Sequence, residues 1–351
     1  MESVFKDLVV VEIASVLAGP SVGMYFAERG ARVIKVENKL SGGDVTRSWK
    51  LSSEHQDSPH SAYFASINWN KEHLFLNFKD SSEMNQLKKI IAEADIVLTN
   101  FKKGGAKKFG LDFESLKEIN PEIIVGVISG YGEESDRVAF DLILQADSGF
   151  MSMNGTPESG PVKMPVALID ILAGHQLKEG LLEALLLKSK TKNLAVKISV
   201  SLYDAALASL ANQATNYLIA NHIPTRIGSK HPNIAPYGEL FETADKRTLT
   251  FAIGSDKQFY ALIELLQLDE LKKFSSNQSR VKHRLEIEKC LQEKVKTWNA
   301  DELLSQCIKR MIPAAIVRNL KEILDGAEVQ DLILKDEIGS RLKTVIYHLE
   351  H

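Results

Sequence analysis

The strongest constraint on the fold is an alternation of strand-like and helix-like segments close to the N-terminus. Residues 8–13 are mostly apolar and rich in valine, which is typical of a strand buried on both faces of a parallel sheet. Gly19 then permits a turn, Pro20 suits the first position of a helix, and Gly30 ends the helical segment. Because residues 33–36 form a second apolar run, the whole segment predicts a βαβ unit.

The same alternation continues along the chain. Met84, Leu87 and Ile91 mark one face of a helix, and the pattern from Val196 to Leu202 indicates a strand with one wet face. Further strands are expected at residues 96–98 and 123–128, and further helices around Leu116 and over residues 203–220. Segments in this order predict an α/β domain built on a doubly wound, Rossmann-like parallel sheet.

A loop rich in proline and glycine, residues 221–238, marks the expected end of this domain. Beyond it come a strand at residues 249–253, two or three charged amphipathic helices up to about Lys309, and a strand at residues 312–317. These segments predict a second, smaller α/β domain. The expected division is a large domain at 1–220 joined by the C-terminal segment 321–348, a linker at 221–234 and a small domain at 235–320.

Composition excludes several classes of partner. Apolar residues make up 44% of the 351 residues, and a net charge of −3 gives no general attraction to nucleic acid or to an anionic membrane. No apolar run reaches membrane-spanning length, and the first residues lack the features of a signal peptide. Cys290 and Cys307 have no metal-ligand spacing, so we expect no metal site and a reduced, cytoplasmic setting.

The first βαβ unit also invites a dinucleotide interpretation. Glu37 ends the second strand, where an acid that binds ribose would lie. The turn at residues 18–23 reads Ala-Gly-Pro-Ser-Val-Gly and lacks the glycine that allows close approach to a pyrophosphate. NAD binding is therefore not favoured, and the pattern gives Glu37 no role.

A basic segment at residues 100–110 directly follows a predicted strand. It carries lysines at 102, 103, 107 and 108 around two glycines. Open α/β sheets bind ligands beyond the carboxyl ends of their strands, and lysines with backbone N–H groups can hold phosphates there. A solvated basic turn is the alternative, and the segment alone does not decide between them. Lys71, near another strand start, adds a further candidate cation.

Asp170 is the candidate nucleophile. It lies between an apolar run at residues 166–169 and a helix-like run at residues 171–176. A carboxylate can form covalent acyl intermediates. An aspartate that precedes a helix is, however, also a preferred N-cap, and the local pattern by itself favours this purely structural role.

These separate features gain specificity from their order. The series is Val16-Leu17-Ala18-Gly19-Pro20, Gly30-Ala31-Arg32-Val33-Ile34-Lys35-Val36-Glu37, Gly43-Asp44-x-Thr46-Arg47, Asn68-x-Asn70-Lys71, Ala94-Asp95-x5-Asn100-Phe101, Ser129-Gly130-Tyr131-Gly132 and Asp170. It resembles the class III CoA-transferases of the CaiB/BaiF type, the group of formyl-CoA transferase and carnitine CoA-transferase. The resemblance runs from about Leu8 to Val317.

The resemblance implies an enzyme that moves CoA from an acyl-CoA to a free carboxylic acid. In such an enzyme Asp170 carries first the acyl group and then CoA as an aspartyl-CoA intermediate. CoA and acyl-CoA are substrates rather than tightly bound cofactors, and the protein is an interlocked homodimer. The residues implied along the CoA are Val16, Ala18, Lys71, Asn100 and Phe101. We expect the CoA phosphates near the cations Lys71, Lys102, Lys103, Lys108 and Arg137.

The chain departs from the family at several of these positions. Lys108 replaces a common arginine, which keeps the charge but loses bidentate geometry, and Asn38 replaces a basic residue of some members. Leu17 replaces a glutamine of formyl-CoA transferase, whose glycine-rich loop has no counterpart at residues 220–238. Specificity for formate or oxalate is therefore not expected.

Two alternatives remain open at this point. The first is a 2-methylacyl-CoA racemase or epimerase of the same family, although Phe140 stands where its histidine base is expected. The second is an inactive relative that only binds CoA.

Overall fold

The computed structural model describes residues 4–347, which fall into two compact units. Unit 1 comprises Met1–Phe150, Lys163–Ala214 and Gln330–His351, and unit 2 comprises Met151–Val162 and Thr215–Val329. Residues 151–162, which the sequence placed in the large domain, belong to unit 2 because they bond to its loop. The Gly228 N–H donates to the Gly155 carbonyl over 2.8 Å, and Arg226 Nη1 donates to the Ser152 carbonyl over 3.1 Å.

Unit 1 is built on a six-stranded sheet in which every neighbouring pair is parallel. Its strands are β1 Val9–Glu12, β2 Arg32–Asn38, β3 Glu72–Leu76, β4 Ile96–Thr99, β5 Ile124–Ser129 and β6 Val196–Ser201. The order β3-β2-β1-β4-β5-β6 is that of a doubly wound fold, so the predicted α/β class is confirmed. The strand order reverses between β1 and β4, where such sheets bind ligands.

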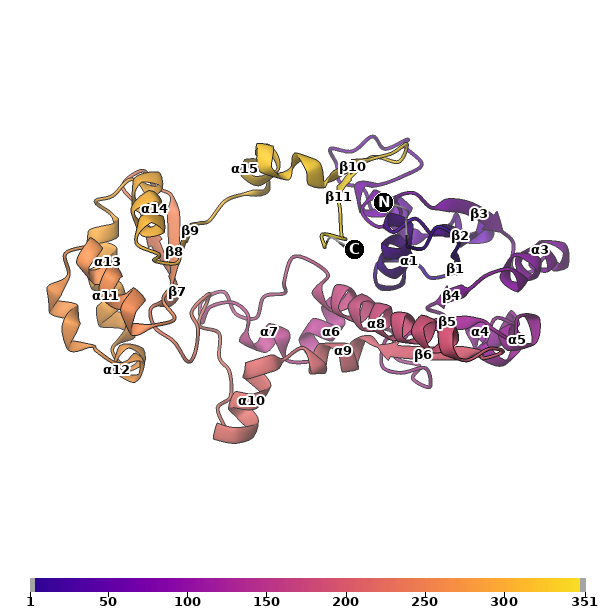
Figure 1. The fold of residues 1–351 in the computed structure, drawn as a ribbon, viewed down its shortest axis with the longest axis horizontal. Helices are drawn as coiled ribbons and strands as arrows, with labels where there is room; N and C mark the ends of the chain where they lie inside the picture. Colours follow the sequence, from indigo (N-terminus) through magenta and orange to yellow (C-terminus); the bar gives the residue numbers. More distant parts are fainter. Residues whose placement is uncertain (1–3, 348–351) are drawn as a thin grey trace. The chain divides into compact units, whose positions relative to one another are not determined.

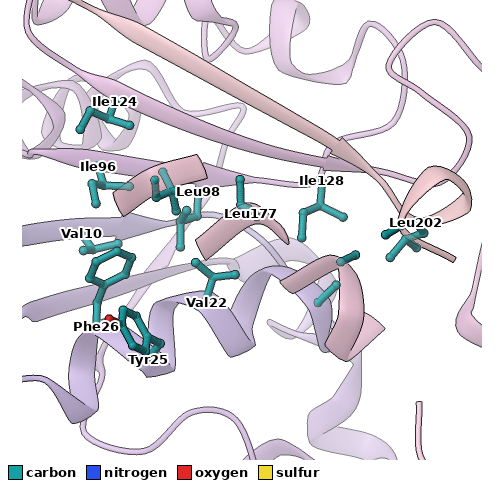
Figure 2. Packing of buried hydrophobic residues seen from close by; sticks show 14 of the residues in the cluster. Val10, Val22, Tyr25, Phe26, Ile96, Leu98, Ile124, Ile128, Leu177 and Leu202 are labelled. Carbon is teal, nitrogen blue, oxygen red and sulfur yellow. The ribbon is translucent and has the colours of Figure 1, made fainter. Parts of the chain in front are cut away.

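Helices cover both faces of this sheet, and β1 shows why. Val10 belongs to the apolar cluster under α1 (Ala18–Glu28) and α8 (Leu168–Lys190). Val11, on the opposite side of the strand, belongs to the cluster under α3 (Ser81–Ala92) and α5 (Phe113–Ile119). The first cluster joins side chains from α1 and α8 to the two central strands (Figure 2): Val22, Phe26, Leu177, Val10, Ile96 and Leu98.

The chain between these strands and after β6 contains several shorter elements. They are η1 Lys39–Ser41, η2 Val45–Ser48, α2 Ala62–Ala65, α4 Gly105–Lys108, α6 Asp141–Asp147, α7 Phe150–Met153, α9 Leu202–Ala208 and α10 Ala211–Ala220. Figure 1 shows α8 running alongside β6, with which it packs. The single helix predicted over residues 203–220 is wrong. Ser209 Oγ donates to the Ala205 carbonyl and Ala211 adopts a φ of 47°, so the chain turns between α9 and α10.

A close contact between α1 and α8 orients the start of α8. A β-carbon on Gly174 would lie 3.2 Å from the Ala18 carbonyl oxygen and 2.5 Å from Ser21 Oγ, so the helices approach where glycine leaves room. Asp170 lies one turn before Gly174 on the same helix face. The contact therefore places Asp170 toward the N-terminal end of α1.

The C-terminal segment of unit 1 contains a hairpin of β10 (Ile333–Lys335) and β11 (Ser340–Leu342) and then follows α1. Glu28 accepts from Arg341 and from the backbone N–H groups of Thr344 and Val345. These bonds attach the end of the described chain to the helix that follows β1.

Unit 2 is smaller and contains an antiparallel sheet in the order β7-β8-β9. Its strands are β7 Tyr237–Glu242, β8 Thr248–Ala252 and β9 Ala314–Ile316. Its helical elements are α11 Asp256–Leu265, η3 Asp269–Lys273, α12 Asn277–Lys282, α13 Arg284–Val295, α14 Ala300–Lys309 and α15 Leu320–Leu324, and η4 Ala327–Leu332 begins in unit 2 and ends in unit 1. Its core gathers Phe241, Leu249, Phe251, Leu262 and Leu291. Within residues 4–347, none of the helices has the length and apolar character needed to cross a membrane.

Candidate active site

Asp170 lies within the first turn of α8 rather than before it. The N-cap position is held by Ala167, which makes no side-chain cap, so the N-cap interpretation of Asp170 is wrong. The helix start is instead capped by Asp141, whose Oδ1 accepts the Ile169 N–H over 2.7 Å and the Asp170 N–H over 3.4 Å. The Asp170 side chain is thereby left available for another role.

The environment of Asp170 favours its neutral form. The residue is 7% exposed, and burial together with the negative charge of Asp141 raises its pKa to about 7. No residue in the range 4–347 donates a hydrogen bond to its carboxylate. A desolvated carboxylate without a partner is a stronger nucleophile than a solvated one.

Asp141 connects α6 to the segment that leads into α8. Its Oδ2 accepts from Gln145 Nε2 over 2.6 Å, and Gln145 Oε1 accepts the Met164 N–H over 2.7 Å. Sequence reasoning missed this role, because only the fold brings Asp141 to a helix start 29 residues further along the chain. An acid directly after Phe140 at the beginning of a helix was the available signal.

The turn between β1 and α1 is fixed by side chains from three other segments. Asn100, which follows β4, accepts the Ser15 N–H over 3.1 Å and donates to the Ser15 carbonyl over 2.8 Å. Lys35 donates to the Ala14 carbonyl over 3.0 Å. Asp44 accepts the N–H of Val16, which has a φ of 73°. The predicted site residues Val16 and Asn100 thus lie together at this turn, and Ala18 directly follows it as the first residue of α1.

Four buried charges lie beside this turn. Lys35 Nζ is 2.9 Å from Glu12 Oε1 and 3.0 Å from Asp44 Oδ2, and Lys71 Nζ is 2.7 Å from Glu12 Oε2. Lys71 also donates to the Pro20 carbonyl and to Asn68, so protein acceptors occupy all three of its protons. This placement does not support the expected contact between Lys71 and the CoA phosphates.

A pocket of about 260 Å³ opens beyond the carboxyl ends of β1, β2 and β4. Among the predicted residues, Asn100, Phe101 and Lys102 line it. Phe78 and Phe109 complete an aromatic wall, with ring centroids 5.5 Å apart, and Phe101 lies 6.1 Å from Phe109. The position is the one expected for a ligand of a doubly wound sheet.

The remaining predicted cations are exposed and do not line this pocket. Lys103 lies 3.8 Å from carboxylates of Glu134 and Asp136, and Lys108 lies 5.8 Å from the centroid of the Phe109 ring. Arg137 forms an ion pair with Asp147 at 2.8 Å. The structure therefore groups Asn100, Phe101 and Lys102 with the turn and leaves these three cations outside the pocket.

Glu37 proves to be an internal ion-pair partner. Its carboxylate lies 2.6 Å from Arg47 Nη2 and 3.0 Å from His73 Nδ1. Burial alone would raise the pKa of Glu37, but hydrogen bonds from Arg47 and His73 outweigh burial and hold that pKa well below the usual range. Within the described part of the chain no group of three or more His, Cys, Asp or Glu residues is arranged to hold a metal.

Comparisons with known proteins assign the family. The profile described as CoA-transferase family III matches residues 5–340. The succinate–glutarate CoA-transferase of Agrobacterium fabrum is 35% identical over 96% of this chain and 86% of its own length. The human succinyl-CoA:glutarate CoA-transferase is 32% identical over 91% of this chain and 73% of its own.

A solved structure agrees with these relatives. The crystal structure of a CAIB/BAIF family protein from Brucella suis has a TM-score of 0.86 and 34% identity, covering 99% of this chain and 93% of that chain. Relatives and structure both span almost the whole sequence. The chain therefore belongs to CoA-transferase family III, as the order of its motifs predicted.

Proposed function

We propose that this enzyme moves CoA from an acyl-CoA donor to a free dicarboxylic acid through a covalent intermediate on Asp170. The observation that carries the proposal is the buried Asp170 carboxylate, which lacks a hydrogen-bond donor within residues 4–347 and lies toward the start of α1. Relatives named for succinate, glutarate and mesaconate support succinyl-CoA as donor and a dicarboxylate as acceptor.

The reaction proceeds by exchange of acyl bonds. An Asp170 oxygen attacks the thioester carbon, the C–S bond breaks, and a mixed anhydride and CoA thiolate result. The thiolate attacks the Asp170 carbonyl carbon, which releases the donor acid and leaves an aspartyl-CoA thioester. The acceptor carboxylate then attacks that thioester, and the released thiolate attacks the acceptor carbonyl carbon of the new anhydride. The new acyl-CoA leaves, Asp170 is regenerated, and no water is consumed.

Two features of the site support these steps. Burial of Asp170 keeps water away from the anhydride and thioester, which both hydrolyse readily. The N–H groups of Ala18 and Gly19, the first two residues of α1, have no acceptor inside the helix, and the positive end of the helix favours a developing oxyanion.

The pocket beside the turn supports an orientation for CoA. Its volume of about 260 Å³ suits one portion of the molecule, and the rings of Phe78, Phe101 and Phe109 offer faces for a flat purine. Lys102 at its lining would then meet a phosphate, with Lys103, Lys108 and Arg137 as further exposed cations. The large domain at 1–220 with the C-terminal segment is accordingly proposed to bind CoA.

We also propose that the protein is a homodimer, interlocked as the family resemblance implies. Helix α8 is apolar on most sides, and its outer residues Leu182, Leu186 and Leu187 are exposed in the single chain. Leu142 and Ile143 of α6 are exposed as well. Apolar surface of this extent is typical of a face that another chain covers.

The proposal is tested by transfer with an Asp170→Asn variant. Succinyl-CoA and glutarate are incubated with each protein, and glutaryl-CoA is followed by liquid chromatography. Because the amide cannot form the anhydride, we expect transfer to fall by about 10³-fold or more. Asp112→Asn, which changes the cap of α5, is the matched control and should retain transfer. Substantial transfer by Asp170→Asn would contradict the proposal.

The same preparations separate the alternatives. A racemase would incorporate solvent deuterium at the α-carbon of a 2-methylacyl-CoA, which we do not expect because Phe140 offers no proton acceptor. An inactive relative would bind CoA in calorimetry but would not transfer CoA from any acyl-CoA to any free acid.

A further inference from the structure

We propose that Asp44 is a positioning residue that holds Val16 in a left-handed conformation, so that the turn after β1 faces Asp170. This inference deepens the proposed function and rests on it for its effect on catalysis. The turn links β1 to α1, and it lies where the contact between Gly174 and Ala18 directs the start of α8.

The backbone conformation of Val16 calls for a restraint. Its φ is 73°, in the region that glycine adopts freely and that a β-branched residue avoids. Such strained residues persist where surrounding structure fixes them, and they are common at functional sites. Asp44 supplies that restraint, since its two carboxylate oxygens lie 3.2 and 3.4 Å from the Val16 nitrogen.

Asp44 is itself fixed from other directions. Its Oδ1 accepts the Thr46 N–H over 3.0 Å and the Thr46 hydroxyl over 2.8 Å. Its Oδ2 lies 3.0 Å from Lys35 Nζ, and its side chain is 1% exposed. The carboxylate therefore has one orientation, in which it meets the Val16 N–H.

The four buried charges around Asp44 have a net charge of zero, so they need no counter-ion from the surface. Glu12 and Asp44 supply two carboxylates, and Lys35 and Lys71 supply two ammonium groups, joined through three ion pairs. Buried ion pairs contribute little net stability compared with apolar residues of similar size, and specificity of structure is their better attested use. The two lysines also donate to the carbonyls of Ala14 and Pro20, on either side of Val16.

An amide cannot replace the Asp44 carboxylate in this setting. Asparagine at position 44 has one oxygen, whereas Thr46 occupies one Asp44 oxygen and Lys35 and Val16 approach the other. If the amide oxygen serves Thr46, the NH₂ group faces the Lys35 ammonium and the Val16 N–H, and the Val16 N–H keeps only the longer contact of 3.4 Å to that oxygen. Val16 is then held more weakly in the left-handed region.

A glycine substitution at position 16 offers a test of this role. Glycine adopts a positive φ without strain, so the turn of a Val16→Gly variant depends much less on Asp44. If Asp44 acts by holding Val16, the effect of Asp44→Asn must be large in the wild-type background and small in the Val16→Gly background. A role in the fold alone would produce the same loss in both backgrounds.

The experiment is a double-mutant cycle of wild type, Asp44→Asn, Val16→Gly and the double variant. Transfer from succinyl-CoA to glutarate gives kcat and KM, and urea titration gives the unfolding midpoint. We expect Asp44→Asn to lower kcat about tenfold more in the wild-type background than in the Val16→Gly background. The urea midpoint should also fall further when Val16 is present. Equal losses in the two backgrounds would overturn the proposal.

Two further variants keep this outcome interpretable. Asp112→Asn removes the carboxylate that caps α5, and its effect should not depend on residue 16; a dependence of similar size would overturn the proposal. If Asp44→Asn yields no folded protein, the double variant Asp44→Asn/Lys35→Gln, which removes one buried charge of each sign, replaces it in the cycle. If the wild type transfers no CoA, the proposed function fails. The urea midpoints of the four proteins still decide whether Asp44 holds Val16.

Discussion

At the scale of single residues, Asp141 and Asp170 have different roles at the start of α8. Asp141 accepts the N–H groups of Ile169 and Asp170, and the Asp170 carboxylate is left buried without a donor among the described residues. Burial and the Asp141 charge together raise the pKa of Asp170 to about 7. The same pair therefore sets both the position and the ionisation of the proposed nucleophile.

The pH dependence of transfer follows from this pair. The ionised form of Asp170 attacks, so kcat/KM of wild type should rise with pH through about 7. Asp141→Asn keeps an acceptor for the Ile169 N–H but removes the negative charge, which lowers the pKa of Asp170. We expect the acidic limb of the kcat/KM profile to move to lower pH. An unchanged limb in this variant would show that the limb does not report Asp170.

Stability should report the same titration with a definite sign. The pKa of Asp170 is raised from 3.8 to about 7, so between these values the folded chain binds more protons than the unfolded chain. The free energy of unfolding of wild type therefore falls as pH rises through this window. Compared with Asp170→Asn, wild type should lose on the order of 2–4 kcal/mol between pH 4 and pH 8. Parallel urea titrations of the two proteins check this, and identical pH profiles would count against the raised pKa.

At the scale of elements, the contact between α1 and α8 links the turn to the nucleophile. Gly174→Ala would bring a methyl group to 3.2 Å from the Ala18 carbonyl oxygen. We expect a loss of about 1–3 kcal/mol in the free energy of unfolding, together with a lower kcat, because the start of α8 must shift. Gly254→Ala in unit 2, where the new methyl would lie 3.7 Å from Gln258, is the control and should change neither quantity. A Gly174→Ala enzyme with wild-type kcat would show that the contact between α1 and α8 does not position Asp170 for catalysis.

The elements also show what the sequence could and could not predict. Apolar runs such as residues 8–13 located the parallel strands, because a strand buried on both faces needs side chains of one kind. Asp170 was found through the resemblance, but its place inside α8 was missed because the cap comes from distant Asp141. Lys71 was expected near phosphates, and nothing local indicates that Glu12 accepts its ammonium group. Contacts between segments far apart in sequence account for these differences.

At the scale of the whole molecule, the exposed apolar residues of α8 make assembly the main prediction. Light scattering at micromolar concentration should give the mass of a dimer. Leu186→Glu, at a position 57% exposed in the single chain, should weaken the dimer because it places a charge in an apolar interface. Lys190→Glu, an exposed change on the same helix, is the control and should leave the dimer intact. A monomer mass for the wild type would contradict the proposed homodimer.

The covalent intermediate on Asp170 is the central claim, and chemical trapping tests it most directly. Wild type is incubated with succinyl-CoA and hydroxylamine, digested, and its peptides are mapped by mass spectrometry. We predict loss of transfer activity together with a hydroxamate on Asp170, because hydroxylamine attacks the anhydride or the aspartyl-CoA thioester at its carbonyl carbon. Neither change should occur without succinyl-CoA. Full activity and an unmodified Asp170 peptide, in an enzyme that still transfers CoA, would contradict the account.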